Sequence, residues 1–157
     1  MNKPLIFAMI LFVIIGFSTL IYANSKTVLK EKQSPYDHVT ESQIEVLNDK
    51  IIIYVDNPSF SKYADTNSMD PLFDKDANGL EIIPQNENDI HVGDVIAYQS
   101  SYVDGLVVHR VIESGNDING KYFILKGDNN PDQDPEKIRF DQIKYILIGV
   151  IYWWILK

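Results

Sequence analysis

The chain has 157 residues, of which 45% are hydrophobic, and this size allows one compact domain plus an additional segment rather than two sizeable cores. The formal net charge of −8 argues against a nucleic-acid partner, because binding to phosphate backbones requires clustered Lys and Arg. The absence of cysteine excludes disulfides, a thiolate nucleophile and a cysteine-based zinc site, so any catalysis must use oxygen and imidazole groups.

The N-terminal region contains one long apolar run. Residues 5–22, LIFAMILFVIIGFSTLIY, carry no charge. An α-helix of this run is about 27 Å long at ~1.5 Å per residue, which matches the hydrocarbon layer of a bilayer. We therefore predict a transmembrane anchor in residues 1–25 that contacts the lipid bilayer. The alternative is a signal peptide cut after Ala23, but Ile21 does not suit the third position before the cut, and the apolar run is longer than usual.

The charges that flank this run bear on its orientation. Lys3 precedes it, whereas Lys26, Lys30 and Lys32 follow it. Because positive flanks favour the cytoplasmic side, this count alone places the downstream domain in the cytoplasm.

Residues 26–50 are predicted to form a linker. The segment is polar and contains Pro35. Within it, TESQIEVLND has the signature of a helix start, with Thr40 as N-cap and Gln43 completing a capping box. A short helix is therefore expected inside the linker.

Residues 51–157 are predicted to form a mainly antiparallel β domain. Short runs rich in β-branched and aromatic residues alternate there with Gly, Asn, Asp and Pro, which is the pattern of strands and turns. The last run is too short for a second membrane span and is expected to be a closing strand, although Trp153 and Trp154 would also suit a bilayer interface. The predicted strands cover 51–55, 92–98, 106–113, 121–126 and 145–156.

The stretch NSMDPLFDKDANGLE contains the opening of a calcium loop. Its portion DKDANG (74–79) fits the first half of an EF-hand loop, but the eighth and twelfth positions hold Glu81 and Gln85 instead of an apolar residue and a Glu. Pro84 would interrupt the exit helix. A solvated acidic turn is expected instead. The stretch DNNPDQD (128–134) is also rich in oxygen ligands but lacks the glycine of the sharp turn, so metal binding there is only the weaker alternative and no metal ion or cofactor is predicted.

The same stretch offers a serine nucleophile in a turn, Ser68. A serine needs a base that takes its proton and a third group that fixes the tautomer of that base. In GLVVHRVIE, strand alternation places His109 on the face of Val107 and Val111, where partial burial favours the neutral imidazole that a base requires. A core histidine bonded to a carbonyl is the alternative. The other two histidines occur in polar surroundings without such partners and are assigned no role, namely His38 and His91.

Hairpin geometry brings carboxylates towards His109. The predicted strands 106–113 and 121–126 share a turn centred near Asp117, which places His109 opposite Leu125. The next loop, KGDNNPDQD, therefore begins beside the imidazole. Any of its three aspartates could accept the Nδ1 proton, and the alternative is ordinary turn chemistry, above all for the first of them. These candidates are Asp128, Asp132 and Asp134.

Four boxes together carry a family resemblance. NSMDP, VGDVIAY, VVHRVI and KGDNNPDQD occur in the order and approximate spacing of the signal peptidase I family, in its archaeal and endoplasmic-reticulum branch. The chain resembles this family over about residues 60–150, and the predicted anchor lies where the family has one. The resemblance implies a signal-peptidase-like β domain and a Ser-His-Asp arrangement, since this branch has histidine where the bacterial branch has a lysine base.

The resemblance assigns a role to each matching position. Ser68 corresponds to the nucleophile and His109 to the general base. Asp134 matches the aspartate that orients the histidine, Asp128 takes the supporting position, and Asp132 is the less favoured orienter.

The family's Ser-Gly-Ser before the methionine corresponds here to residues 66–68. Thr66 keeps a hydroxyl that could join the Ser68 backbone N–H in an oxyanion hole. Asn67 replaces the glycine and tolerates the left-handed backbone conformation.

The implied activity is a membrane-anchored serine endopeptidase that removes signal peptides from secreted or membrane preproteins. The resemblance places the catalytic domain on the exoplasmic side of the cell membrane, against the lysine count. A substrate would lie extended near YADTNS, with small side chains at the cut, and no cofactor is required. A self-cleaving repressor-type protease would need a lysine base. The stronger alternative is a catalytically inactive, membrane-anchored β domain that binds secretory partners.

Overall fold

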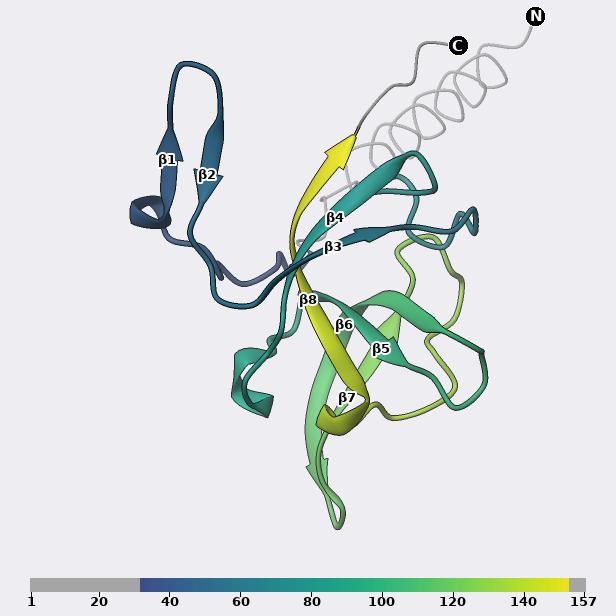
Figure 1. Ribbon diagram of the computed structural model, residues 1–157. Coiled ribbons are helices and arrows are strands. Elements are labelled where there is room, and N and C mark those ends of the chain that lie inside the picture. The colour runs from purple at the N-terminus through teal and green to yellow at the C-terminus, as the bar shows by residue number, and fades with distance from the viewer. Residues whose placement is uncertain (1–31, 153–157) are drawn as a thin grey trace, which may run out of the picture. The chain divides into compact units, whose positions relative to one another are not determined.

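The computed structural model describes residues 32–152, and they form a mainly antiparallel β structure, which confirms the predicted β class (Figure 1). The predicted anchor in residues 1–25 lies outside the described residues. Within residues 32–152, no helix has the length and apolar character needed to cross a bilayer.

Six strands form the main sheet, and each pairs antiparallel with its neighbours. The long strand β8 lies between β4 and β5 and so connects the two halves of the sheet (Figure 1). Across the sheet the order is β3 (Pro58–Lys62), β4 (Ala77–Ile82), β8 (Ile143–Tyr152), β5 (Val95–Gln99), β6 (Leu106–Asp117) and β7 (Gly120–Lys126).

A separate two-stranded hairpin precedes this sheet. It consists of β1 (Ile44–Val46) and β2 (Ile51–Ile53). The helix expected in the linker is limited to one 3₁₀ turn, η1 (Glu41–Gln43), with Thr40 at its N-cap. The turn stops because the chain then pairs as β1, so the predicted boundary between residues 50 and 51 falls inside this hairpin. Two further 3₁₀ turns are η2 (Glu87–Asp89) and η3 (Phe140–Gln142).

The five predicted strands overlap β2, β5, β6, β7 and β8. β8 confirms the closing strand as far as Tyr152, whereas Trp153 and Trp154 lie outside the described residues. The prediction of a solvated acidic turn at residues 74–85 was wrong for residues 77–82, because they form β4, which is mostly buried between β3 and β8. Tertiary pairing makes this strand from a sequence, ANGLEI, that has few β-branched residues.

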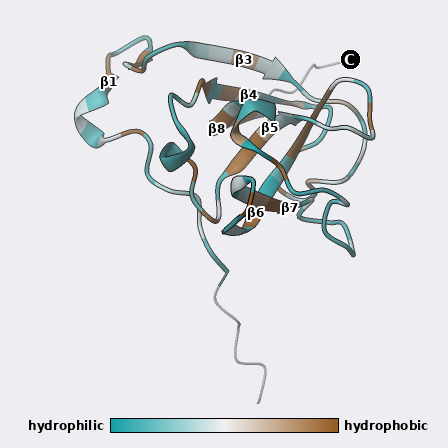
Figure 2. Ribbon diagram, turned by 90° about the horizontal axis from the view of Figure 1, so that it is seen from below, coloured by the Kyte–Doolittle hydropathy of each residue, from teal (hydrophilic) through white to brown (hydrophobic). Residues whose placement is uncertain are grey.

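Both faces of β5 are buried, and this explains how a small sheet makes a core. Ile96 and Tyr98 pack with Phe123 in one apolar cluster. Val95 belongs to a second cluster that contains Met69. Figure 2 shows the corresponding hydrophobic segments in brown among β5 to β8, whereas β3 is pale. The second cluster holds the segment that carries Ser68.

The β6–β7 hairpin differs in register from the prediction. Leu125 pairs with Val111, not with His109, because the strands stay paired as far as Asp117 and Gly120 and the turn is therefore centred between residues 118 and 119. A bulge between Val111 and Glu113 reduces this displacement by one residue. His109 pairs with Ile96 of β5 and lies beyond the part of β6 that pairs with β7. The imidazole therefore adjoins the loop that follows β7, as expected.

Candidate functional site

Ser68 is displayed on a turn whose next residue is fixed in the core. The Met69 side chain is 2% exposed, and its carbonyl accepts hydrogen bonds from the backbone N–H groups of Leu72 and Phe73. Asn67 has a φ of 58°, in the left-handed region that asparagine tolerates better than most residues. Burial of the methionine leaves the adjacent serine at the surface of the domain.

Asp74 stabilises this turn, a role that sequence analysis did not predict. Its Oδ1 accepts hydrogen bonds from the backbone N–H groups of Thr66, at 3.1 Å, and Asn67, at 3.3 Å. Desolvation raises the pKa of Asp74, but these bonds and that of Lys75 outweigh it and leave the pKa below its usual value. The turn is therefore braced by an ionised carboxylate at neutral pH.

The loop after β7 packs directly on the serine turn. The Asn129 backbone N–H donates to the Ser68 carbonyl at 2.9 Å, and its side-chain amide donates to the Asn67 carbonyl at 3.0 Å. Gly127 allows this approach, because a Cβ there would lie 2.7 Å from the Ser68 carbonyl oxygen. Two sequence boxes that lie far apart in the chain thus form one unit.

Asp134 is the predicted aspartate that contacts His109. The His109 Nδ1 lies 2.9 and 2.8 Å from the two carboxylate oxygens, and both residues are buried. The Asp134 backbone N–H donates to the Leu125 carbonyl at 2.8 Å, which ties this end of the loop to β7. Since Nδ1 is engaged by the carboxylate, Nε2 is the ring nitrogen left for chemistry.

Tyr98 completes the surroundings of Asp134 and was also missed. Its hydroxyl donates to Asp134 Oδ2 at 2.8 Å. Burial, followed by the negative charge of Asp134, raises the pKa of Tyr98 far above its usual value, so the phenol stays a donor. A tyrosine inside the apolar strand run VIAYQ carries no signal of such a role.

The other two candidate aspartates have different positions. Asp128 forms a two-pronged pair with the Arg110 guanidinium, at 2.7 Å from Nε and 2.6 Å from Nη2. Arg110 also donates to the Gly93 carbonyl at 2.7 Å, so Asp128 fixes the loop against β6. Asp132 is exposed and is not a hydrogen-bond partner of His109. The structure therefore separates the three acids, which sequence analysis left as alternatives.

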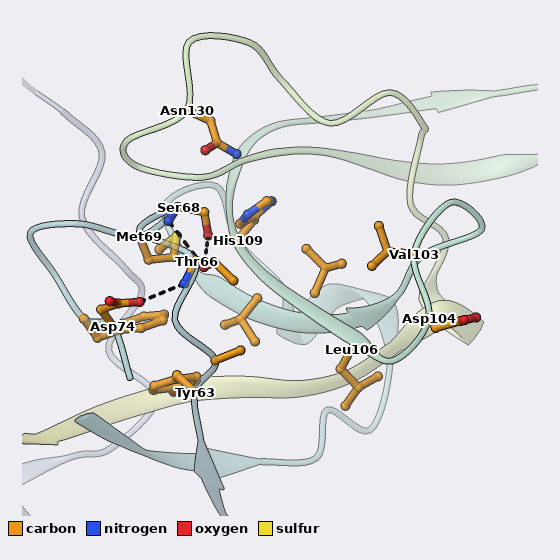
Figure 3. Close-up of a pocket in the computed structure, with 14 residues that line it drawn as sticks. Tyr63, Thr66, Ser68, Met69, Asp74, Val103, Asp104, Leu106, His109 and Asn130 are labelled. Carbon is orange, nitrogen blue, oxygen red and sulfur yellow. Dashed lines mark hydrogen bonds between the residues drawn. The ribbon is translucent and has the colours of Figure 1, made fainter. Parts of the chain in front are cut away.

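Ser68 and His109 line one pocket of about 380 Å³, together with Thr66 and Asn130 (Figure 3). The Ser68 hydroxyl lies 3.1 Å from Thr66 Oγ1, and no hydrogen bond joins it to His109 in this structure. The Ser68 backbone N–H, which is the other predicted oxyanion donor, points to the same Thr66 oxygen at 3.4 Å. Apolar side chains form much of the remaining wall, among them Tyr63, Phe73, Val107 and Val108.

Comparison with known proteins finds a likeness over one short stretch of the chain. No family model matches the chain. A stretch of 44 residues, 28% of the chain, is 52% identical to the uncharacterized protein MJ0260 of Methanocaldococcus jannaschii. The aligned part covers 22% of the length of that protein, so the likeness is confined to a fraction of each chain.

Proposed function

We propose that this chain is a membrane-anchored serine endopeptidase of the signal peptidase I type, which removes signal peptides from preproteins. The observation that carries the proposal is the buried contact of Asp134 with His109 Nδ1 in a pocket that Ser68 also lines. The resemblance of the four sequence boxes supports the same reading. The anchor in residues 1–25 and the exoplasmic position of the domain are parts of this proposal.

The mechanism assigns one task to each residue. Asp134 accepts a hydrogen bond from the Nδ1–H of His109 and so keeps the lone pair on Nε2. The Ser68 hydroxyl exchanges its hydrogen bond with Thr66 for one with Nε2, gives up its proton and attacks the peptide carbonyl. His109 then protonates the leaving amine. Water releases the acyl group from Ser68 by the same proton transfers in reverse order.

Thr66 and the Ser68 backbone N–H supply the oxyanion hole in this scheme. In the structure the Ser68 N–H lies 3.4 Å from Thr66 Oγ1. When the oxyanion forms, it accepts hydrogen bonds from the Ser68 N–H and from the Thr66 hydroxyl, and these two groups no longer bond to each other. The bond of the Thr66 N–H to Asp74 keeps the threonine in place during this exchange. Removal of one such donor typically lowers kcat by about 10²- to 10³-fold.

An extended substrate would bind along free strand edges. Within residues 32–152, β3 pairs only with β4, and residues 106–109 of β6 pair only with β5, because the pairing with β7 begins at Arg110. Their open backbone groups can hold varied sequences by main-chain hydrogen bonds. The pocket walls formed by Phe73 and Val108 favour a small apolar side chain next to the cut. Anchoring in the membrane would raise the effective concentration of membrane-bound substrates.

Cleavage of a preprotein by the purified full-length chain in liposomes tests the proposal. We expect cleavage after a small residue, located by mass spectrometry, and its loss in Ser68→Ala and His109→Ala. Asp132→Asn is the matched control, since this aspartate is exposed and does not contact His109, and it should cleave at the parental rate.

The alternative is an inactive, membrane-anchored β domain that binds secretory partners. The bond of the Ser68 hydroxyl to Thr66 instead of to His109 favours it. Several intact preproteins would support this alternative and oppose the peptidase. Variants that cut as well as the parent would oppose the assignment of Ser68 and His109.

A further inference from the structure

Three potential metal ligands meet where the segment before η1 contacts the turn before β5. One ring nitrogen each of His38 and His91 and a carboxylate oxygen of Asp94 lie within 4.8 Å of one another. The Asp94 side chain is fully buried and that of His38 is 10% exposed, whereas His91 is 39% exposed. The cluster shares no residue with the lining of the Ser68 pocket.

One of these ligand atoms has no hydrogen-bond partner. His91 Nδ1 is buried and is unpaired among the atoms of residues 32–152. Its distance to Asp94 Oδ2 is 3.7 Å, beyond hydrogen-bond range. Buried polar atoms are nearly always paired, so an orphaned imidazole nitrogen that faces a carboxylate points to a missing positive ligand.

The spacing suits a four-coordinate ion. Ligands about 2.0–2.1 Å from a tetrahedral zinc ion lie roughly 3.3 Å from each other. The Asp94 Oδ2 is 3.0 Å from His38 Nε2 and 3.7 Å from His91 Nδ1, so the two distances bracket that value. Each histidine is therefore spaced from Asp94 about as two ligands of one zinc ion are.

Neighbouring groups already orient two of the three ligands, Asp94 and His91. Asp94 Oδ2 accepts the His91 backbone N–H at 2.8 Å, and Oδ1 accepts the Tyr36 backbone N–H at 2.8 Å. The Tyr36 ring stacks on the His91 ring with centroids 3.9 Å apart and an interplanar angle of 12°. Such outer contacts fix ligand geometry in metal sites before the ion binds.

We propose that His38, His91 and Asp94 bind one divalent transition-metal ion of the zinc class. Two imidazoles and one carboxylate are the ligands of such ions, whereas Mg²⁺ and Ca²⁺ prefer oxygen sets. Three protein ligands leave a fourth position for water. The ion fastens the segment that carries Tyr36 and His38 to the catalytic domain.

The structure gives both histidines a partner that sequence analysis does not find. His38 Nε2 lies 3.0 Å and His91 Nδ1 lies 3.7 Å from Asp94 Oδ2. His38 and Asp94 are 56 residues apart in the chain, so no ligand spacing appears in the sequence.

Calorimetric titration of the metal-free, full-length chain in detergent with Zn²⁺ tests the site, and Co²⁺ absorption reports its geometry. We expect one ion per chain, a tetrahedral Co²⁺ spectrum and a higher melting temperature with Zn²⁺. His91→Gln should weaken binding by more than the 10- to 100-fold typical of an outer-shell change, and the rise in melting temperature should disappear. If His91→Gln fails to fold, His38→Gln takes its place, and the same losses of zinc affinity and of thermal stabilisation are expected.

His109→Gln is the matched control, because it removes the other buried histidine–carboxylate pair. It should leave zinc affinity and stoichiometry unchanged. Absence of zinc binding, or binding that persists in both His91→Gln and His38→Gln, would mean that Asp94 forms only ion pairs here and would overturn the proposal. Loss of binding in His109→Gln would assign the ion to the serine pocket and overturn it as well.

Discussion

Asp134 is held by three separate elements, and this defines the site at the scale of single residues. Its carboxylate contacts His109 on β6 and Tyr98 on β5, while its backbone bonds to Leu125 on β7. Because these contacts fix its orientation, the carboxylate can hold an imidazole in one tautomer. Asp128 and Asp132 lack this combination, although all three belong to the same loop.

Replacement of Asp134 by Asn should nearly abolish turnover. The isosteric amide keeps the shape but favours the wrong tautomer of His109, a change that lowers kcat by about 10⁴-fold in a serine triad. Asp128→Asn should cost less, since it weakens the pair with Arg110 without touching the imidazole. Steady-state kcat values for a preprotein substrate compare the two variants, and equal losses would contradict these assignments.

Tyr98→Phe should have a smaller effect. It removes one hydrogen bond to Asp134, and a net loss of about 0.5–1.5 kcal/mol corresponds to roughly a two- to twelvefold decrease in kcat. Because the hydroxyl acts through Asp134, the change should vanish when combined with Asp134→Asn. If the fold-decreases in kcat of the two single variants multiply in the double variant, this positioning role is contradicted.

At the scale of elements, the serine turn and the loop after β7 form one packed unit. Backbone and side-chain bonds of Asn129 join the loop to Ser68 and Asn67, and Asp74 braces the turn from its other side. The proposed nucleophile, Ser68, is therefore held by the same loop that carries Asp134, the partner of the proposed base His109.

Gly127→Ala should separate these elements. The added methyl would meet both the Ser68 carbonyl oxygen and the Asn130 side-chain amide at 2.7 Å, so the serine turn must shift. We expect kcat to fall by at least tenfold, since small displacements of reacting groups are costly. Asn129→Ala is the comparison, because it keeps the backbone bond to Ser68 and should lose less activity. The reverse order of the two variants would refute the packing account.

At the scale of the whole molecule, β4 carries a buried carboxyl in the middle of one half of the sheet. Glu81 is 1% exposed and accepts a hydrogen bond from the Ser61 hydroxyl on β3. Desolvation raises the pKa of Glu81, and the bond from Ser61 offsets this only in part. The folded state thus prefers the neutral carboxyl more than the unfolded state does.

The sign of the pH dependence follows from that shift. The contribution of Glu81 to stability is fully present below its unfolded pKa and is lost as pH rises through the higher folded pKa. Glu81→Gln should remove this loss and raise the free energy of unfolding near neutral pH. Urea denaturation of the full-length chain at several pH values measures this free energy. A Glu81→Gln variant whose stability depends on pH as in the parent would contradict the raised pKa of Glu81.

Sequence analysis predicted the features that depend on local patterns and missed those that depend on tertiary contacts. Alternation in GLVVHRVIE predicted the strand of His109, and the short hairpin brought the loop with Asp134 beside it despite a register error. The roles of Tyr98 and Glu81 depend on partners from other elements, and that of Asp74 depends on how its own loop folds back on Thr66. The strand ANGLEI has little intrinsic preference for β structure and forms because β3 and β8 flank it.

The most direct test of the account is the single-turnover rate of preprotein cleavage for the parent, Ser68→Ala, His109→Ala and the double variant. Nucleophile and base act as one unit in a serine mechanism, so each single change should remove nearly all catalysis and the double variant should be no slower than either. A His109→Ala variant that cuts near the parental rate, or losses that multiply in the double variant, would contradict a shared Ser68–His109 mechanism.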